Sequence, residues 1–187
     1  MKGLSLRSGA PEETERVAAA LVSFLRNGDV VLLSGDLGAG KTVFTRGLAR
    51  AAGVAEPVTS PTFTLIHSYR TAIGLDLLHA DVYRLETTGE IADLGLAELI
   101  EEHAFALVEW GERAAGALGP DHLLVTLSVP EQPGEAGPSA RTLTVRPVGR
   151  SWEERWARLE HALRAAAPAI DEAGVCGPAE ATRGVRA

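Results

Sequence analysis

Residues 30–45 (VVLLSGDLGAGKTVFT) constrain this chain more than any other stretch. An apolar run leads into residues 35–42, which follow the pattern G-x-x-x-x-G-K-[ST], and a helical pattern begins directly afterwards. Glycines between a buried strand and a helix start let backbone N–H groups converge on phosphate oxygens, and the helix adds the positive end of its dipole. The stretch therefore predicts a P-loop that binds a nucleoside triphosphate, in preference to a strand–helix turn that happens to be rich in glycine.

Each part of this loop has an expected role. The backbone of six consecutive residues is expected to wrap the phosphates: Asp36, Leu37, Gly38, Ala39, Gly40 and Lys41. The Lys41 ammonium is expected to reach the β- and γ-phosphates, and the Thr42 hydroxyl is expected to bind Mg²⁺. The composition supports this role for Lys41, because 16 of the 18 basic residues are arginines and the other lysine is Lys2. The chain uses a compact ammonium where a planar guanidinium would fit poorly.

Length and composition define the broad class of the protein. A chain of 187 residues with 45% hydrophobic and 23% charged residues is expected to form one globular domain. No apolar run reaches the roughly 18 residues of a membrane span. A single cysteine, Cys176, excludes an internal disulfide and favours a cytoplasmic location. The net charge of −7 argues against a broad nucleic-acid-binding surface, so any role on RNA is expected to be local or exercised through a partner.

Hydrophobic periodicity predicts alternating strands and helices. The expected strands lie around residues 4–6, at 30–33, in the second half of 58–66, and at 75–80, 104–110, 123–129 and 142–148. The expected helices run from Pro11 to the Asn27-Gly28 pair, from Thr42 to Gly53, in one or two pieces within residues 86–103, and over 151–167. Within residues 86–103, four side chains are expected to point inward: Leu94, Leu96, Leu99 and Ile100.

The same patterns predict three segments of different character. A P-loop domain is expected over residues 1–150, followed by an amphipathic helix at 151–167. Trp152 and Trp156 of this helix are expected to pack on the sheet, in preference to forming a patch for a partner. Residues 168–187 are rich in Ala, Gly, Pro and charge without periodicity, and this composition predicts a disordered tail.

Acidic and hydroxyl residues stand at the ends of two of the expected strands. Glu109 comes after an apolar run, as the acidic residue of a Walker B strand does, and is expected to be the second Mg²⁺ ligand, directly or through water. The alternative is a carboxylate that caps the next turn. Thr59, Ser60 and Thr62 surround Pro61. This pattern is typical either of a switch loop that senses the γ-phosphate, with Thr62 nearest the metal, or of a well-bonded turn.

Missing motifs narrow the class of P-loop protein. A GTPase reads guanine with an N-K-x-D loop, but the one asparagine, Asn27, precedes the P-loop and no lysine follows it, so ATP is expected. A small-molecule kinase would have an arginine-bearing lid; Arg113, Arg141 and Arg146 are scattered candidates, and this alternative stays open. A nucleotide-gated binding module is a third alternative. The five histidines and the single cysteine lack the spacing of a zinc site.

Four blocks of sequence establish a more specific resemblance. They are GDLGAGKTVFTRGLAR at residues 35–50, VTSPTFTL at 58–65, HADVYRL at 79–85 and LVEW at 107–110. In this order and at these spacings the chain resembles the TsaE (YjeE) family over about residues 8–148. The resemblance implies an α/β protein with a P-loop NTPase-like three-layer sandwich, a mixed parallel and antiparallel sheet, and hydrolysis of ATP with Mg²⁺.

The resemblance also implies partners. Family members support the threonylcarbamoyladenosine modification beside the tRNA anticodon, together with TsaB and TsaD proteins. TsaD transfers the threonylcarbamoyl group to N6 of the adenosine, and the TsaE-like ATPase is thought to reset or license the complex between cycles. The resemblance thus implies a partner-dependent ATPase that is slow alone, is not itself the transferase, and meets tRNA only through the complex.

Further site residues follow from the resemblance. Asp81 is expected to act in catalysis with Lys41 and Glu109, holding a metal-bound water or orienting the attacking one; the alternative is a cap of the following turn. Thr62 and Arg141 are expected at the nucleotide, although the insertion EQPGEAGPSA at residues 131–140 leaves the alignment of Arg141 open. Trp110 either stacks on the site or belongs to the core. Residues 8–14 are a candidate for the adenine pocket.

Overall fold

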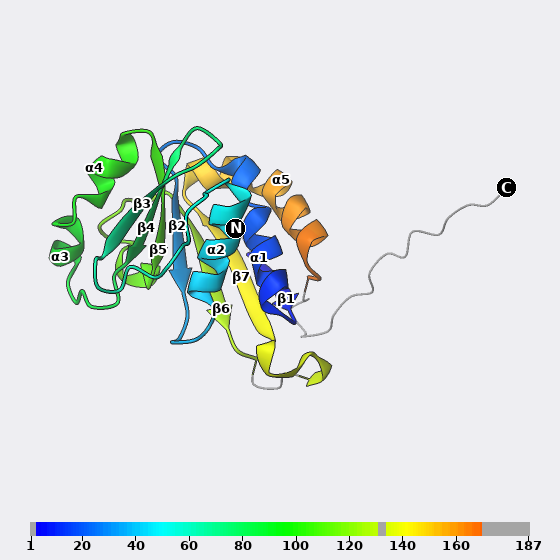
Figure 1. The fold of residues 1–187 in the computed structure, drawn as a ribbon. Coiled ribbons are helices and arrows are strands. Elements are labelled where there is room, and N and C mark those ends of the chain that lie inside the picture. Colours follow the sequence, from blue (N-terminus) through cyan, green and yellow to red (C-terminus); the bar gives the residue numbers. More distant parts are fainter. Residues whose placement is uncertain (1–2, 131–133, 170–187) are drawn as a thin grey trace.

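A mixed β-sheet is the centre of the fold (Figure 1). In the computed structural model, which describes residues 3–130 and 134–169, seven strands form one sheet. They are β1 (Leu4–Ser8), β2 (Val30–Ser34), β3 (Ile66–Arg70), β4 (Asp76–Asp81), β5 (Ala104–Glu109), β6 (His122–Ser128) and β7 (Arg141–Val148). Across the sheet they lie in the order β1-β7-β6-β2-β5-β4-β3, so the predicted N-terminal edge strand is confirmed.

The middle of the sheet is parallel, and its flanks are antiparallel. β2 pairs in parallel with β5 and β6, and β4 pairs in parallel with β5. At one flank β7 pairs antiparallel with both β6 and β1, and the antiparallel β3–β4 hairpin forms the other flank. β2 and β5 are buried on both faces, which explains their continuous apolar sequences. The carboxyl ends of β2, β4 and β5 meet at one edge, where open α/β sheets bind ligands.

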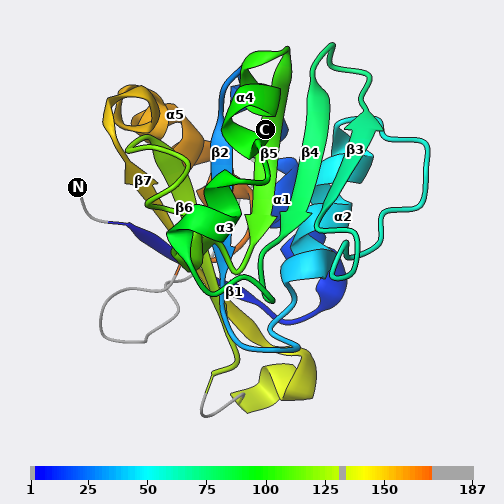
Figure 2. The same ribbon diagram turned by 90° about the vertical axis from the view of Figure 1, so that its left-hand side faces the viewer.

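Helices cover both faces of this sheet (Figures 1 and 2). They are α1 (Pro11–Ala19), α2 (Lys41–Ala51), α3 (Thr88–Ala92), α4 (Leu96–Glu101) and α5 (Arg150–Ala166). α3 and α4 lie on one face, and α1, α2 and α5 lie on the other. Each face has its own apolar core. The predicted α/β class and the three-layer sandwich with a mixed sheet are therefore confirmed.

The face covered by α1, α2 and α5 has the larger core. Trp152 and Trp156 on α5 are buried in the same core as Val145 of β7, which confirms their predicted packing on the sheet. α1 and α2 approach closely at Gly47, where a Cβ atom would lie 2.4 Å from the Cα of Glu15. Any larger residue at position 47 would push apart these two helices, the second of which follows the P-loop.

The first helix is shorter than predicted. α1 ends at Ala19, and a 3₁₀ turn (Val22–Phe24) follows it. Gly28, which was expected to end the helix, lies in the turn before β2 at φ +84°, and its N–H donates to the Ala104 carbonyl. The apolar residues 21–25 still reach the core, so the periodic pattern located the buried face but not the end of the helix.

The strand predicted in the second half of residues 58–66 is wrong. β3 begins only at Ile66, and residues 62–64 form a turn. The Leu65 N–H donates to the Pro61 carbonyl at 2.7 Å, and Leu65 adopts a positive φ of 66°. The bend that Pro61 favours therefore overrides the alternation of polar and apolar residues.

One inward-pointing leucine was also predicted wrongly. Leu99 is 41% exposed, whereas Leu96 and Ile100 are buried. Because α4 has only six residues, its buried face is defined by this pair four residues apart, and Leu99 lies off that face.

The last described residues pair with β1. The Arg7 N–H donates to the Pro168 carbonyl at 2.9 Å, and Ala169 forms an antiparallel bridge with Leu6. The rest of the predicted tail, with Cys176, lies outside the described residues, as do residues 131–133 of the insertion. No helix in the described part of the chain is long and apolar enough to cross a membrane.

Candidate functional site

The loop between β2 and α2 has the backbone of an anion-binding turn. Gly35 has φ +133°, and a Cβ atom there would lie 2.1 Å from the Leu127 carbonyl oxygen, so only glycine fits. Gly40, at φ +107°, is the N-cap of α2 and supplies no side-chain acceptor. The first N–H groups of α2 therefore remain available to an anion at the positive end of the helix dipole.

Lys41 lies inside this loop. Its side chain is buried, and its Nζ donates to the carbonyl oxygens of Gly35 at 2.6 Å and Asp36 at 3.0 Å. The ammonium lies 3.8 Å from the centre of the Trp110 ring. Burial lowers the pKa of Lys41 below its ordinary value, although nearby carboxylates partly offset this effect. The predicted phosphate-binding lysine is thus held at the loop by carbonyl oxygens and an aromatic face.

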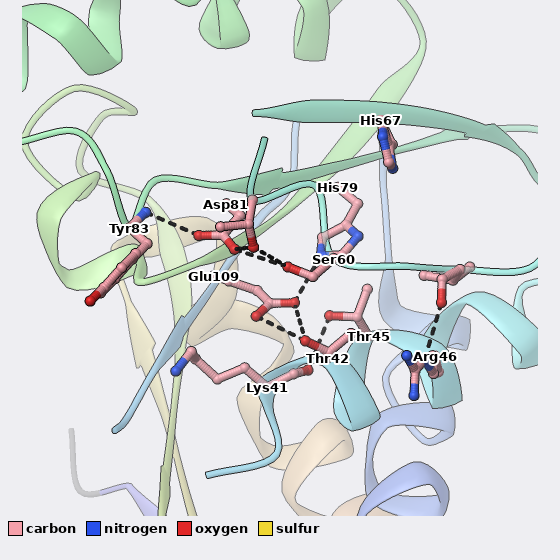
Figure 3. A network of polar contacts seen from close by, with 12 residues as sticks. Lys41, Thr42, Thr45, Arg46, Ser60, His67, His79, Asp81, Tyr83 and Glu109 are labelled. Atoms are coloured by element: carbon pink, nitrogen blue, oxygen red, sulfur yellow. Dashed lines mark hydrogen bonds and ion pairs between the residues drawn. The ribbon is translucent and has the colours of Figure 1, made fainter. Parts of the chain in front are cut away.

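Thr42 and Glu109, the two predicted Mg²⁺ ligands, lie in direct contact (Figure 3). The Thr42 hydroxyl donates to Oε1 and Oε2 of Glu109, at 2.9 and 3.1 Å. Glu109 ends β5, whereas Thr42 is in the first turn of α2, and the pairing of β5 with β2 brings them together. The Glu109 carboxylate is 3% exposed, and its Oε1 also lies 3.0 Å from Nε2 of His79.

Asp81 lies beside Glu109 at the end of β4, in register with it across the sheet. Its Oδ2 accepts hydrogen bonds from the hydroxyls of Ser60 at 2.9 Å and Thr62 at 2.7 Å. Its Oδ1 accepts from the Tyr83 N–H at 3.0 Å. The carboxylate therefore caps the next turn, as one alternative predicted, and at the same time holds the hydroxyl-rich bend at the site (Figure 3).

These groups line one cleft of about 460 Å³ at the edge of the sheet. Its polar walls are the P-loop, the hydroxyls of Ser60 and Thr62, and the carboxylates of Asp81 and Glu109. Hydroxyl and carboxylate oxygens are the ligands that Mg²⁺ prefers. Because the described residues contain no group of three His, Cys, Asp or Glu side chains able to hold a metal ion alone, a cation at Thr42 and Glu109 would need phosphate and water oxygens as well. The donor set thus fits Mg²⁺ bound together with a nucleotide.

Trp110 belongs to the site and to the core together. Its indole lines the cleft, and its ring centre lies 4.9 Å from that of Tyr83. The half-buried side chain also packs against the core on the α3 and α4 face. A positive φ of 62° turns the backbone at Trp110 directly after β5.

Arg141 contacts the loop backbone. Its Nε donates to the Ala39 carbonyl at 3.0 Å and its Nη2 to the Gly38 carbonyl at 3.2 Å. These bonds join the start of β7 to the P-loop across 102 residues of sequence. The structure thus places Arg141 beside the P-loop, where its guanidinium donates to carbonyl oxygens.

A second cleft, of about 170 Å³, lies on the other side of the P-loop. Pro11 and Thr14 of α1 form one wall, and Pro138, Ser139 and Arg141 form another. The predicted segment at residues 8–14 therefore lies next to the loop. The rings of Pro11 and Pro138 make part of this small cleft apolar.

Sequence reasoning missed His79 as a site residue. It was quoted in the block HADVYRL and rejected as a zinc ligand but given no role, yet it contacts Glu109 from the neighbouring strand. The usable signal was its spacing from Asp81, because residues two apart on a strand point to the same face of a sheet.

The arginines expected of a kinase do not converge. Arg113 donates to the backbone carbonyls of Tyr83 and Leu85, Arg141 lies on the P-loop, and Arg146 is exposed on β7. No lid of the kind expected for a small-molecule kinase is formed by these three residues.

The mixed sheet and the glycine loop define a protein of the P-loop NTPase-like fold class. A family model described as "Threonylcarbamoyl adenosine biosynthesis protein TsaE" matches residues 8–136. The chain belongs to the TsaE family, as its four sequence blocks predicted.

Relatives agree with this assignment over most of the chain. The protein named tRNA threonylcarbamoyladenosine biosynthesis protein TsaE from Bacillus subtilis (strain 168) is 40% identical over 153 residues, which cover 82% of this chain and 91% of the relative. A protein of the same name from Mycobacterium tuberculosis is 43% identical over 124 residues, covering 62% and 73%. The crystal structure of Bacillus subtilis YdiB matches with a TM-score of 0.70 at 33% identity, covering 86% of this chain and 95% of that one.

Proposed function

We propose that this protein is a Mg²⁺-dependent ATP hydrolase required to form the threonylcarbamoyl group on N6 of the adenosine beside the tRNA anticodon. In this proposal it acts in the cytoplasm with TsaB- and TsaD-like partners and does not perform the threonylcarbamoyl transfer itself. The observation that supports hydrolysis most directly is the contact of Glu109 with the Thr42 hydroxyl at the P-loop helix. The names of the relatives support the pathway.

The loop residues have separate roles in the proposed reaction. Backbone N–H groups of residues 36–41 bind the phosphates, and Lys41 exchanges its two loop carbonyl partners for phosphate oxygens. Thr42 and Glu109 hold Mg²⁺, which when bound neutralises charge on the phosphates. Asp81, whose carboxylate already fixes Ser60 and Thr62, orients water at the cleft.

The base is assigned to the second cleft. Pro11 and Pro138 offer apolar contact for adenine, and Ser139 offers a polar edge. Arg141 supports the loop between the two clefts by bonding Gly38 and Ala39. The missing guanine-reading motif favours ATP over GTP.

Exposed apolar side chains at the phosphate cleft support a partner. Leu37 is 87% exposed and Tyr83 is 47% exposed, and both line the cleft. Phe63, in the adjacent bend, is 84% exposed beneath the guanidinium of Arg84. Large apolar side chains gathered at one place are typical of a protein interaction site. We assign this surface to the TsaB- and TsaD-like partners, and the net charge of −7 supports leaving the tRNA to them.

Reconstituted modification tests the proposal. Purified TsaB- and TsaD-like partners, tRNA, ATP and Mg²⁺ are followed over many turnovers with this protein, without it, and with Lys41→Ala. We expect omission and Lys41→Ala to stop product formation after the first turnovers, whereas Lys2→Ala, which changes the only other lysine, retains the full yield. An unchanged yield without the protein would overturn the proposal.

Glu109→Ala in the same assay separates hydrolysis from nucleotide-gated binding. We expect this variant to lose both ATP hydrolysis and multi-turnover modification. Loss of hydrolysis with full modification would instead identify a binding module in which hydrolysis is incidental.

A further inference from the structure

His79 is a fully buried histidine whose imidazole contacts the carboxylate of Glu109. Its side chain is 0% exposed, and its Nε2 lies 3.0 Å from Oε1 of Glu109. A buried polar side chain of this kind costs free energy unless it is hydrogen-bonded. The contact therefore satisfies Nε2 of His79, and it also acts on the carboxylate assigned to the metal.

Strand geometry explains why these side chains meet. Residues 77, 79 and 81 of β4 alternate with residues 78 and 80, which face the α3 and α4 core. On β5, Glu109 shares a face with Phe105 and Leu107, toward α2. Because β4 and β5 are adjacent and parallel, His79 lies next to Glu109 on the α2 face of the sheet. Figure 3 shows the imidazole and the Thr42 hydroxyl on the same carboxylate.

The surroundings of the imidazole indicate its tautomer. Nδ1 of His79 is buried and has no hydrogen-bond partner among the described residues. A proton on Nδ1 would leave a buried N–H group unpaired and turn the lone pair of Nε2 toward a carboxylate. A proton on Nε2 donates to Glu109 and leaves only an acceptor unpaired. The hydrogen-bond network therefore assigns the proton to Nε2.

His79 contacts only one of the two oxygens of Glu109, whereas Thr42 contacts both. The single hydroxyl proton of Thr42 is shared between Oε1 and Oε2, at 2.9 and 3.1 Å. The His79 N–H is directed to Oε1 only. With Oε1 held from two sides, Oε2 is the oxygen with the fewer protein contacts among the described residues.

We propose that His79 is a positioning residue that holds the Glu109 carboxylate in one orientation, so that Oε2 is presented to the cation. The inference rests on the proposed ATP- and Mg²⁺-dependent function. Groups that orient a metal ligand in this way typically change metal affinity or activity by about 10- to 100-fold when they are removed.

A matched pair of amides tests the inference. In His79→Gln the amide nitrogen lies as far along the side chain as Nε2, whereas in His79→Asn it stops near the position of Nδ1. Both variants place a neutral amide in the same pocket, so general destabilisation is similar. The measured quantities are the Mg²⁺ concentration that half-saturates binding of a fluorescent ATP analogue, and the kcat and KM for ATP.

We expect His79→Gln to stay close to the wild-type values. His79→Asn should need about 10-fold more Mg²⁺ and lose about 10- to 100-fold in kcat, with little change in KM. In a Glu109→Gln background, His79→Asn should cause no further loss, because the carboxylate it orients is absent. Equal behaviour of the two amides, or additive losses in the double variant, would overturn the positioning role.

The imidazole ¹⁵N shifts of His79 in the wild-type protein give a test that needs no variant. They should show a proton on Nε2, and an Nε2 without a proton would overturn the inference. If wild type binds no nucleotide with Mg²⁺, the proposed function fails. If wild type binds and hydrolyses ATP but the amides do not differ, only the role of His79 fails.

Discussion

The two ends of β2 each have a buried cluster of charged groups, and the clusters differ in how their charges are balanced. Just before β2, Asp29 forms an ion pair with Arg155 of α5, at 2.6 and 2.7 Å. Just after β2, Lys41 lies near Glu109 and Asp81, but its Nζ donates to loop carbonyls. One end is therefore a closed pair, and the other has two carboxylates for one ammonium.

The Arg155 cluster satisfies every donor of its guanidinium. Besides the two bonds to Asp29, Arg155 donates to the Phe24 carbonyl and to the carbonyl and hydroxyl of Ser151. Five N–H groups thus have five acceptors. This completeness indicates a structural role, because the cluster connects α5 to the strand that precedes the P-loop and leaves no group for a ligand.

The P-loop cluster, in contrast, has more buried carboxylates than cations. Asp81 and Glu109 are each 3% exposed and lie in register on adjacent strands. Two buried carboxylates so close together repel each other, and this repulsion favours a bound cation. In this protein the buried network with unbalanced charge lies at the candidate site, whereas the balanced network connects elements of the scaffold.

Disruption of the ion pair between Asp29 and Arg155 should give the largest change in free energy among these variants. Asp29→Ala leaves the Arg155 charge buried without its carboxylate, and we expect a loss of about 3–5 kcal/mol in the free energy of unfolding. Urea denaturation followed by circular dichroism measures it. Asp76→Ala is the matched control, since Asp76 also stands at the start of a strand but pairs with Arg70, which is 89% exposed. That control should lose no more than about 1 kcal/mol, and equal losses would contradict the comparison.

Glu109→Gln changes the P-loop end of β2, and it should lower the activity without lowering the stability. Removing one of two neighbouring buried charges should leave the free energy of unfolding no lower than in wild type. The kcat of the proposed ATP hydrolysis should fall by about 100-fold or more, which corresponds to about 2.7 kcal/mol in activation free energy. Glu112→Gln, a nearby exposed residue, should change neither quantity. A stability loss as large as that of Asp29→Ala would show that Glu109 belongs to the scaffold.

Arg141→Lys should have the smallest effect of these variants. It tests whether the contacts of Arg141 with the P-loop contribute to ATP binding. The ammonium cannot reproduce the two-carbonyl fork on Gly38 and Ala39, so we expect the Kd for ATP to rise about 10-fold, or about 1.4 kcal/mol. Isothermal titration with ATP measures the change. Arg146→Lys, an exposed arginine on the same strand, should leave the affinity unaltered. An unchanged affinity in both variants would mean that the loop keeps its shape without the fork.

Much of the site was predictable because its chemistry is local. The glycines, Lys41 and Thr42 all lie within residues 35–42, and the apolar run before Glu109 predicted a strand-end carboxylate. The contact between Thr42 and Glu109 followed from the pairing of two such strands. The predicted strand before Ile66 failed because a proline-centred bend competes locally with alternation, and periodicity cannot weigh the two.

The pattern of residues along the chain was enough to specify the P-loop, the α/β class and the face of α5 that packs on the sheet, because these depend on spacings of a few residues. Which elements are neighbours became clear only from the folded structure. In the folded chain Arg155 pairs with Asp29 across 126 residues of sequence, and His79 contacts Glu109 across 30 residues. Packing of the whole chain selects such contacts, so the same types of charged residue form a scaffold at one end of β2 and a candidate active site at the other.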